Sequence, residues 1–199
     1  LCVALVSLTS VAHAGRNCEA KALNVETLTK GLNLAQRTAQ ALEAQYQKDG
    51  SKVVLLARAG QDLSNYDLAY SHFGWSYRTE QGPWRVAHKL NTCGTDAGHV
   101  YRQGLGEFFL DDLWRYVAAV QVPTPAVQQA LWGYLSASQT VLRMHHQPYS
   151  MVSYAWGQKY QQSNQWAMES LAAAMEADTV QQRTQAQAWL KFKGYEPTA

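Results

Sequence analysis

The sequence predicts one α+β domain in which helices pack on an antiparallel sheet. Helical patterns lie near both ends of the chain, and most strand patterns lie between them. Two neighbouring strand patterns are separated by the turn sequence EQGP at residues 80–83, which predicts an antiparallel hairpin. No repeat, low-complexity tract or linker composition divides the 199 residues, so we expect residues 15–199 to form a single domain.

The first half of the chain supplies a long helix and three strands. Residues 25–46 carry apolar side chains at spacings of three and four, which predicts a helix ended by Asp49 and Gly50. Residues 52–58 are typical of a short buried strand, and residues 60–67 of a loop. Residues 70–78 and 84–91 are the two strands of the predicted hairpin.

The second half of the chain is predicted to be mostly helical. Residues 92–99 are typical of a loop, and the stretches LGEFFLDD and RYVAAVQV supply one or two more strands. Thr124 as N-cap and Pro125 in the first turn begin a helix that runs to about Met144. The stretch HHQP ends it, and YSMVSYAWG is a strand or an extended loop. Two helices follow, over residues 160–176 and roughly 180–193, the second stopped by Gly194.

The N-terminal stretch LCVALVSLTSVAHA, residues 1–14, is typical of a signal peptide. An apolar run of about ten residues ends in the small-residue signal Ala12-His13-Ala14, so we expect cleavage after Ala14 and a periplasmic or secreted protein. Because the sequence begins at Leu1, the basic start of the signal peptide is missing and we expect it to be partial. No second apolar stretch of about 20 residues follows, so no transmembrane segment is predicted.

Charge and cysteine content bear on the partners and on the compartment of the protein. The formal net charge of +2 and the absence of a Lys/Arg cluster argue against nucleic acid as a partner. Cys2 leaves with the signal peptide, and the two remaining thiols, Cys18 and Cys93, are expected to form a disulfide in an oxidising compartment. Neither cysteine lies in a lipid-attachment pattern, so no lipid anchor is indicated.

The strand YSHFGWSYR carries the first candidate for chemistry, His72. Side chains alternate along a strand, so His72 shares a small, polar face with Gly74 and Ser76. A general base needs an orienting group on its second ring nitrogen, and His88 or Asn91 lies opposite, depending on the hairpin register. The alternative is that His72 is a hydrogen-bonded histidine of the sheet with no catalytic role.

The stretch YQQSNQW, residues 160–166, supplies the candidate nucleophile, Ser163. A side chain in the first turn of a helix faces the positive end of the helix dipole, where free backbone N–H groups can hold an oxyanion. The alternative is that Ser163 serves only to begin the helix, as serine commonly does.

These two stretches carry a resemblance to a known superfamily. The run GQDLSNYDLAYSHFGW resembles the histidine signature of the NlpC-like papain-fold superfamily, and its matching residues are Gly60, Asp62, Leu63, His72 and Gly74. YQQSNQW resembles the start of the nucleophile helix, with Ser163 in place of the catalytic cysteine. Because the histidine comes first, the order is that of the circularly permuted branch, which includes LRAT-like acyltransferases. The chain also resembles an uncharacterised family of secreted bacterial proteins.

The resemblance implies a permuted papain-like fold and leaves two functions open. One is a hydrolase or acyltransferase acting on envelope peptide or lipid amides and esters, with His72 as base, His88 as orienter and Ser163 as nucleophile. The other is an inactive envelope binding or scaffold domain that keeps the same cleft, because a serine needs more help from a base than a cysteine does.

Neither function needs a cofactor, and other candidate sites are weaker. His99, His145 and His146 do not have the spacing of a metal site. Cys93 lies near two histidines, but its expected disulfide argues against a nucleophilic role. Seven Trp and eleven Tyr leave room for a groove that stacks on glycan or peptide, beside those that fill the core.

Overall fold

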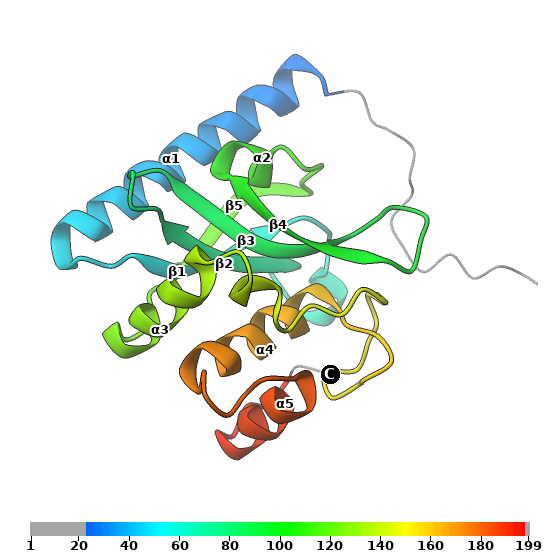
Figure 1. Ribbon diagram of the computed structural model, residues 1–199. Helices are drawn as coiled ribbons and strands as arrows, with labels where there is room; N and C mark the ends of the chain where they lie inside the picture. The colour runs from blue at the N-terminus through cyan, green and yellow to red at the C-terminus, as the bar shows by residue number, and fades with distance from the viewer. Residues whose placement is uncertain (1–22, 198–199) are drawn as a thin grey trace, which may run out of the picture.

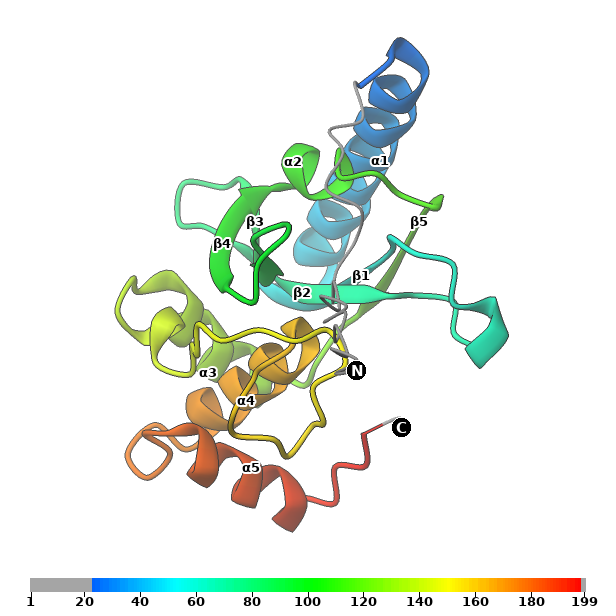
Figure 2. The same cartoon turned by 90° about the vertical axis from the view of Figure 1, so that its right-hand side faces the viewer.

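The computed structural model describes residues 23–197 and contains a five-stranded antiparallel sheet with helices on both faces (Figures 1 and 2). The strand order is β4-β3-β2-β1-β5, so β4 and β5 form the edges. The strands are β1 (Val53–Ala59), β2 (His72–Arg78), β3 (Trp84–Asn91), β4 (Gly98–Gly104) and β5 (Arg115–Gln121). The expected α+β class with an antiparallel sheet is therefore confirmed.

The helices form a layer on each side of the sheet (Figure 1). One layer holds α1 (Val25–Asp49) and α2 (Leu105–Phe109). The other holds α3 (Pro125–Ser136) and α4 (Ser163–Met175), with α5 (Arg183–Phe192) on the outside of α4 (Figure 2). Two short 3-10 helices complete the elements, η1 (Ser64–Tyr66) and η2 (Thr140–Leu142).

The long helix α1 begins and ends as its sequence predicts. The Asn24 side chain accepts a hydrogen bond from the Thr27 N–H at 2.8 Å, which caps the first turn. Gly50 follows with φ of 77°, a left-handed conformation that glycine adopts at low cost, and its N–H bonds the Tyr46 carbonyl. The buried side of α1 is made of Gly31, Leu34, Ala35, Thr38 and Leu42.

Alternation along the strands divides the interior into two cores. Trp75 and Tyr77 of β2 pack with Trp166 on the side of α4. Val54 and Leu56 of β1 and Val86 of β3 pack on the other side with Leu42 and Phe108. Residues one position apart on a strand therefore face different helical layers.

Several predicted elements are wrong in type or extent. Of the two stretches expected to supply one or two more strands, RYVAAVQV forms β5, whereas LGEFF forms α2. Leu105, Phe108 and Phe109 are buried at helical spacing, and the Glu107 carboxylate accepts a hydrogen bond from the Gly104 N–H at 2.9 Å. β4 was missed, since its first residues were assigned to a loop. Helix α3 ends at Ser136 rather than near Met144. Residues 149–157, expected to be a strand or an extended loop, contain no strand, which leaves the loop.

The N-terminal predictions fall outside the described part of the chain. The expected signal peptide, residues 1–14, and Cys18 are not among the described residues, so cleavage and the Cys18–Cys93 bond remain predictions. Within residues 23–197, no helix has the length and apolar character that a membrane crossing requires.

Candidate functional site

Two histidines from neighbouring strands meet on the side of the sheet that α2 covers. His72 begins β2, and its Nε2 lies 2.8 Å from Nδ1 of His88 on β3. The register that pairs Trp75 with Ala87 brings His88 diagonally across from His72, whereas Asn91 pairs with Gly98 at the far end of β3. Of the two predicted neighbours, the structure therefore places His88 beside His72.

Gln103 of β4 extends this pair into a chain of three side chains. Its Oε1 lies 2.8 Å from Nε2 of His88. An amide oxygen only accepts, so Nε2 of His88 donates to it, and Nδ1 of His88 accepts a hydrogen bond from the Nε2–H of His72. Gln103 thereby fixes one tautomer of His88. The sequence did not reveal Gln103, because β4 itself was not recognised.

The surroundings of His88 keep it neutral. Its side chain is fully buried, and its ring packs edge-on against Phe108 of α2 with 5.1 Å between the ring centroids. Burial, and then the positive charge of Arg58, lower the pKa of His88 to about 4. Arg58 itself forms an ion pair with Asp111 at 2.5 Å. On the small, polar face that His72 shares with Gly74 and Ser76, its ring contacts His88 and Phe108.

Ser163 is the first residue of α4, as the sequence predicts. The Gln162 side chain caps the helix by accepting from the Asn164 N–H, and Gln165 reaches back to the Gln162 N–H. The Ser163 side chain is only 8% exposed. Its Oγ lies 3.3 Å from the hydroxyl of Tyr149, in the segment that leads into α4.

The structure does not bring Ser163 together with the two histidines. Helix α4 packs on β2 through Trp75, whose Nε1 donates to the Ala167 carbonyl at 2.9 Å. His72 is three positions from Trp75 and so faces the opposite side of the sheet, where its ring lies 6.0 Å from that of Phe108. Among the described residues, no hydrogen bond joins Ser163 to His72 or His88.

The preference of α4 for this side of the sheet has a simple cause. Phe73, Trp75 and Tyr77 give β2 one large apolar face, and a helix gains most by covering it. The other face of β2 is small and polar, as the sequence indicates, and the side chains that fill it come from β3 and α2. The helix that begins at Ser163 packs on β2, as predicted, but on the face away from His72.

A second polar group lies under α4, centred on the buried Lys89 of β3. The Lys89 ammonium donates to the His146 carbonyl at 2.5 Å and to Oε1 of Gln161 at 2.9 Å. Gln161 in turn donates to Glu169 at 2.5 Å. Burial lowers the pKa of Lys89 to about 7, and the charge of Arg183 acts in the same direction.

Glu169 and Arg183 link α4 to α5 and to the loop before α4. Arg183 Nε donates to the fully buried Glu169 carboxylate at 2.9 Å. The Arg183 guanidinium also bonds the backbone carbonyls of Gly157 and Gln158, at 2.8 and 3.0 Å. These hydrogen bonds connect α5 to α4 and to the loop before α4, which indicates a structural network. This network was not recognised from the sequence; Glu169, the carboxylate inside the apolar run AMESLAAAM, is the residue that could have indicated it.

The residues considered for a metal site or a cysteine nucleophile lie in and near the loops. The His99 and His145 rings lie 6.2 Å apart, and His146 Nε2 faces the Lys159 carbonyl at 3.0 Å. The described residues include no cluster of three or more His, Cys, Asp or Glu side chains suited to a metal ion. Cys93 lies in the turn between β3 and β4.

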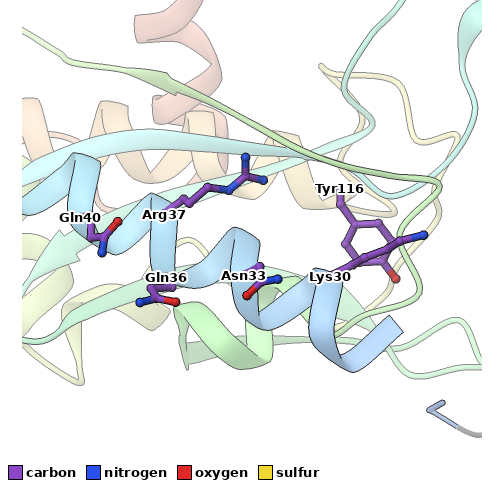
Figure 3. A pocket seen from close by; sticks show the side chains of 6 residues that line it. All are labelled: Lys30, Asn33, Gln36, Arg37, Gln40 and Tyr116. Carbon is purple, nitrogen blue, oxygen red and sulfur yellow. The ribbon is translucent and has the colours of Figure 1, made fainter. Parts of the chain in front are cut away.

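Neither of two surface pockets formed by the described residues is lined by His72, His88 or Ser163. One is an open groove of about 440 Å³ between α1 and β5 (Figure 3). The other, of about 320 Å³, lies where α1 ends and α3 begins. The lining of the first is Lys30, Asn33, Gln36, Arg37, Gln40 and Tyr116.

Comparison with known proteins identifies a family without an assigned activity. A family model described as "Uncharacterized protein conserved in bacteria (DUF2145)" matches residues 45–199. No curated protein and no solved structure matches the chain significantly. The matched part contains His72, His88, Gln103 and Ser163, but begins after most of α1.

Proposed function

We propose that this chain, which belongs to that bacterial family DUF2145, is an exported envelope domain that binds a ligand and lacks papain-type acyl-transfer chemistry. One observation carries the proposal: the Ser163 hydroxyl and the His72–His88 pair lie on opposite faces of the sheet. A serine attacks only when a base accepts its proton, and neither imidazole has access to it.

The actual neighbour of Ser163 does not replace the missing base. Burial raises the pKa of Tyr149, and the hydrogen bond with Ser163 offsets this only in part. The phenol therefore keeps its proton at neutral pH and cannot take one from serine. The Tyr149 and Ser163 hydroxyl groups therefore form an ordinary hydrogen bond near the start of α4.

The two histidines have a structural role in this proposal. His72, His88 and Gln103 come from β2, β3 and β4, so their hydrogen bonds connect three adjacent strands through one buried line. Because His88 is neutral, one ring nitrogen donates and the other accepts, and both are used. This chain of hydrogen bonds stabilises the register of β2, β3 and β4 and involves no proton transfer.

Export and the permuted NlpC-type fold are parts of the same proposal. Export rests on the stretch LCVALVSLTSVAHA. The fold rests on the adjacent strands that carry His72 and His88, followed later in the chain by a helix that starts at Ser163 and packs on the same sheet. A domain that has this framework but keeps Ser163 away from His72 and His88 fits a binding or scaffold role.

The first test replaces Ser163 by cysteine and measures the reactivity of the new thiol. We expect Ser163→Cys and the double variant Ser163→Cys/His72→Ala to show the same thiol pKa, because residue 163 does not contact His72. The pKa is obtained from the pH dependence of iodoacetamide labelling, followed at residue 163 by mass spectrometry. A Tyr149→Phe change in the Ser163→Cys background is the positive control, since it removes the hydroxyl 3.3 Å from this position.

The opposite result is easily recognised. A thiol pKa well below the usual value of about 8.5 that rises when His72 is removed would identify a papain-like pair and overturn the proposal. Turnover of acyl lipids or peptidoglycan peptides by the wild type, lost in Ser163→Ala and His72→Ala, would do the same.

A further inference from the structure

The groove between α1 and β5 is built by a stripe of polar side chains on the exposed side of α1. Lys30, Asn33, Arg37 and Gln40 follow one another at spacings of three and four residues, which places them on one helical face. Gln36 lies beside them, and Tyr116 of β5 closes the groove at the Lys30 end (Figure 3). We call these six residues the α1–β5 groove.

The lining of the α1–β5 groove is unusual in its charge. It contains two cations, three amides and a phenol, and no carboxylate. Lys30 forms an ion pair with Glu26, one turn earlier, at 2.5 Å, and its ammonium lies 6.0 Å from the centre of the Tyr116 ring. Arg37 forms no ion pair with any described residue, so its guanidinium supplies the uncompensated positive charge of the groove.

These groups match the chemistry of an acidic sugar. A guanidinium presents parallel N–H donors that fit the two oxygens of a carboxylate. Side-chain amides both donate and accept, as neighbouring hydroxyl groups require. A tyrosine ring offers an apolar face and a polar edge, on which a sugar ring can stack. The volume of about 440 Å³ lies in the range of small-ligand sites.

We propose that the α1–β5 groove binds a carboxylate-bearing oligosaccharide, with Arg37 on the carboxylate and Tyr116 against a sugar ring. The inference names a ligand class for the binding role proposed above and rests on that role. Residues 30–40 precede the family-matched part of the chain, whereas Tyr116 lies within it.

The test is calorimetric titration of the mature protein with tetragalacturonic acid. We expect binding that Arg37→Gln weakens at least about tenfold, because a hydrogen-bonded charge pair is lost. Lys48→Gln, which removes one charge from the exposed last turn of the same helix, should leave the affinity unchanged. The fully methyl-esterified tetramer should bind more weakly than the acid by a similar factor.

Several results would overturn the inference. Absence of binding by the wild type would do so, as would equal weakening by Arg37→Gln and Lys48→Gln, which indicates attraction to net charge alone. Inorganic phosphate that binds as tightly as the tetramer would identify a simple anion site instead. None of these measurements depends on residue 163, so a failure here is distinguishable from a reactive, histidine-dependent thiol in Ser163→Cys.

Discussion

His88 shows how one buried side chain can hold three strands together. Its two ring nitrogens contact His72 and Gln103, and its ring rests against Phe108. A second proton on this imidazole would make Nδ1 a donor, so the hydrogen bond from His72 would be lost unless His72 moved its own proton to its other ring nitrogen. The same burial that makes the hydrogen bonds strong therefore makes a charge there costly.

Stability should consequently fall when the pH drops through the range in which His88 resists protonation. The unfolded chain binds a proton with the ordinary pKa of 6.5, whereas the folded protein does so only at about 4. The stabilisation is complete above 6.5 and is lost progressively on acidification toward 4, by on the order of 3 kcal/mol. Urea unfolding of the wild type and of His88→Gln across this range measures it.

The variant and a control separate this effect from general acid sensitivity. His88→Gln should be less stable than the wild type near neutral pH but should lose less stability on acidification. His146→Gln, which leaves both hydrogen bonds of His88 in place, should retain the loss of stability that His88 causes on acidification. Parallel curves for the wild type and His88→Gln would contradict the assignment.

At the scale of elements, β2 and β3 leave no room for a side chain at Gly74. A methyl group added there would lie 2.8 Å from both the Ala87 carbonyl oxygen and the His88 Cβ. Real side chains avoid such distances, so the strands accept only glycine at this position without moving apart. Gly74 thus makes room for the histidine pair on this face of the sheet.

Gly74→Ala should therefore destabilise the protein by about 1–3 kcal/mol, as overpacking does, and should weaken the contact between the histidines. The matched control is Gly133→Ala, because Gly133 lies in α3 with no atom within 4 Å of an added methyl group. That change should stabilise the protein by about 0.5–1 kcal/mol through better helix propensity. Thermal and urea unfolding compare the two, and equal effects would refute the packing argument.

Prediction from sequence succeeded for elements with a strong local signal. The periodic helix α1 and the hairpin of β2 and β3 were found almost to the residue. Prediction failed where an element is short, or where its apolar residues follow neither the helical nor the strand spacing. LGEFF is too short to show a period, and β4 begins with the loop-like residues Gly98 and His99. The end of α3 at Ser136 carries no glycine or proline to mark it.

At the scale of the whole molecule, the packing of distant elements determines which candidate residues meet. Adjacency of His72 and His88 could be predicted, because a hairpin with a short turn brings its strands together. The separation of Ser163 could not, since alternation tells which side chains share a face and not which face a distant helix will cover. Gln103 was hidden for a related reason: its neighbours are set by the pairing of β3 with β4, which the sequence did not indicate.

A disulfide between Cys18 and Cys93 is a predicted long-range link, which follows from the proposal that the protein is exported. The bond would close a loop of about 75 residues, which in the chain-entropy model stabilises a fold by about 4 kcal/mol. Peptide mapping of the unreduced protein should find the Cys18–Cys93 pair, and reduction should lower the free energy of unfolding. Cys93→Ala should be insensitive to reductant, and free thiols at both positions in periplasmic protein would contradict the prediction.

The two edges of the sheet also differ in how they meet other chains. β4 is partly covered, because the Gly98 N–H donates to the Gln147 carbonyl at 2.8 Å and Pro148 pairs with Ala97 beyond the strand end. β5 has no outer strand partner among residues 23–197, and Val117 and Val120 on it are exposed. Proline and a covering segment block strand addition, whereas an uncovered edge with valines favours it. When the protein is concentrated, self-association through added strands should therefore begin at β5.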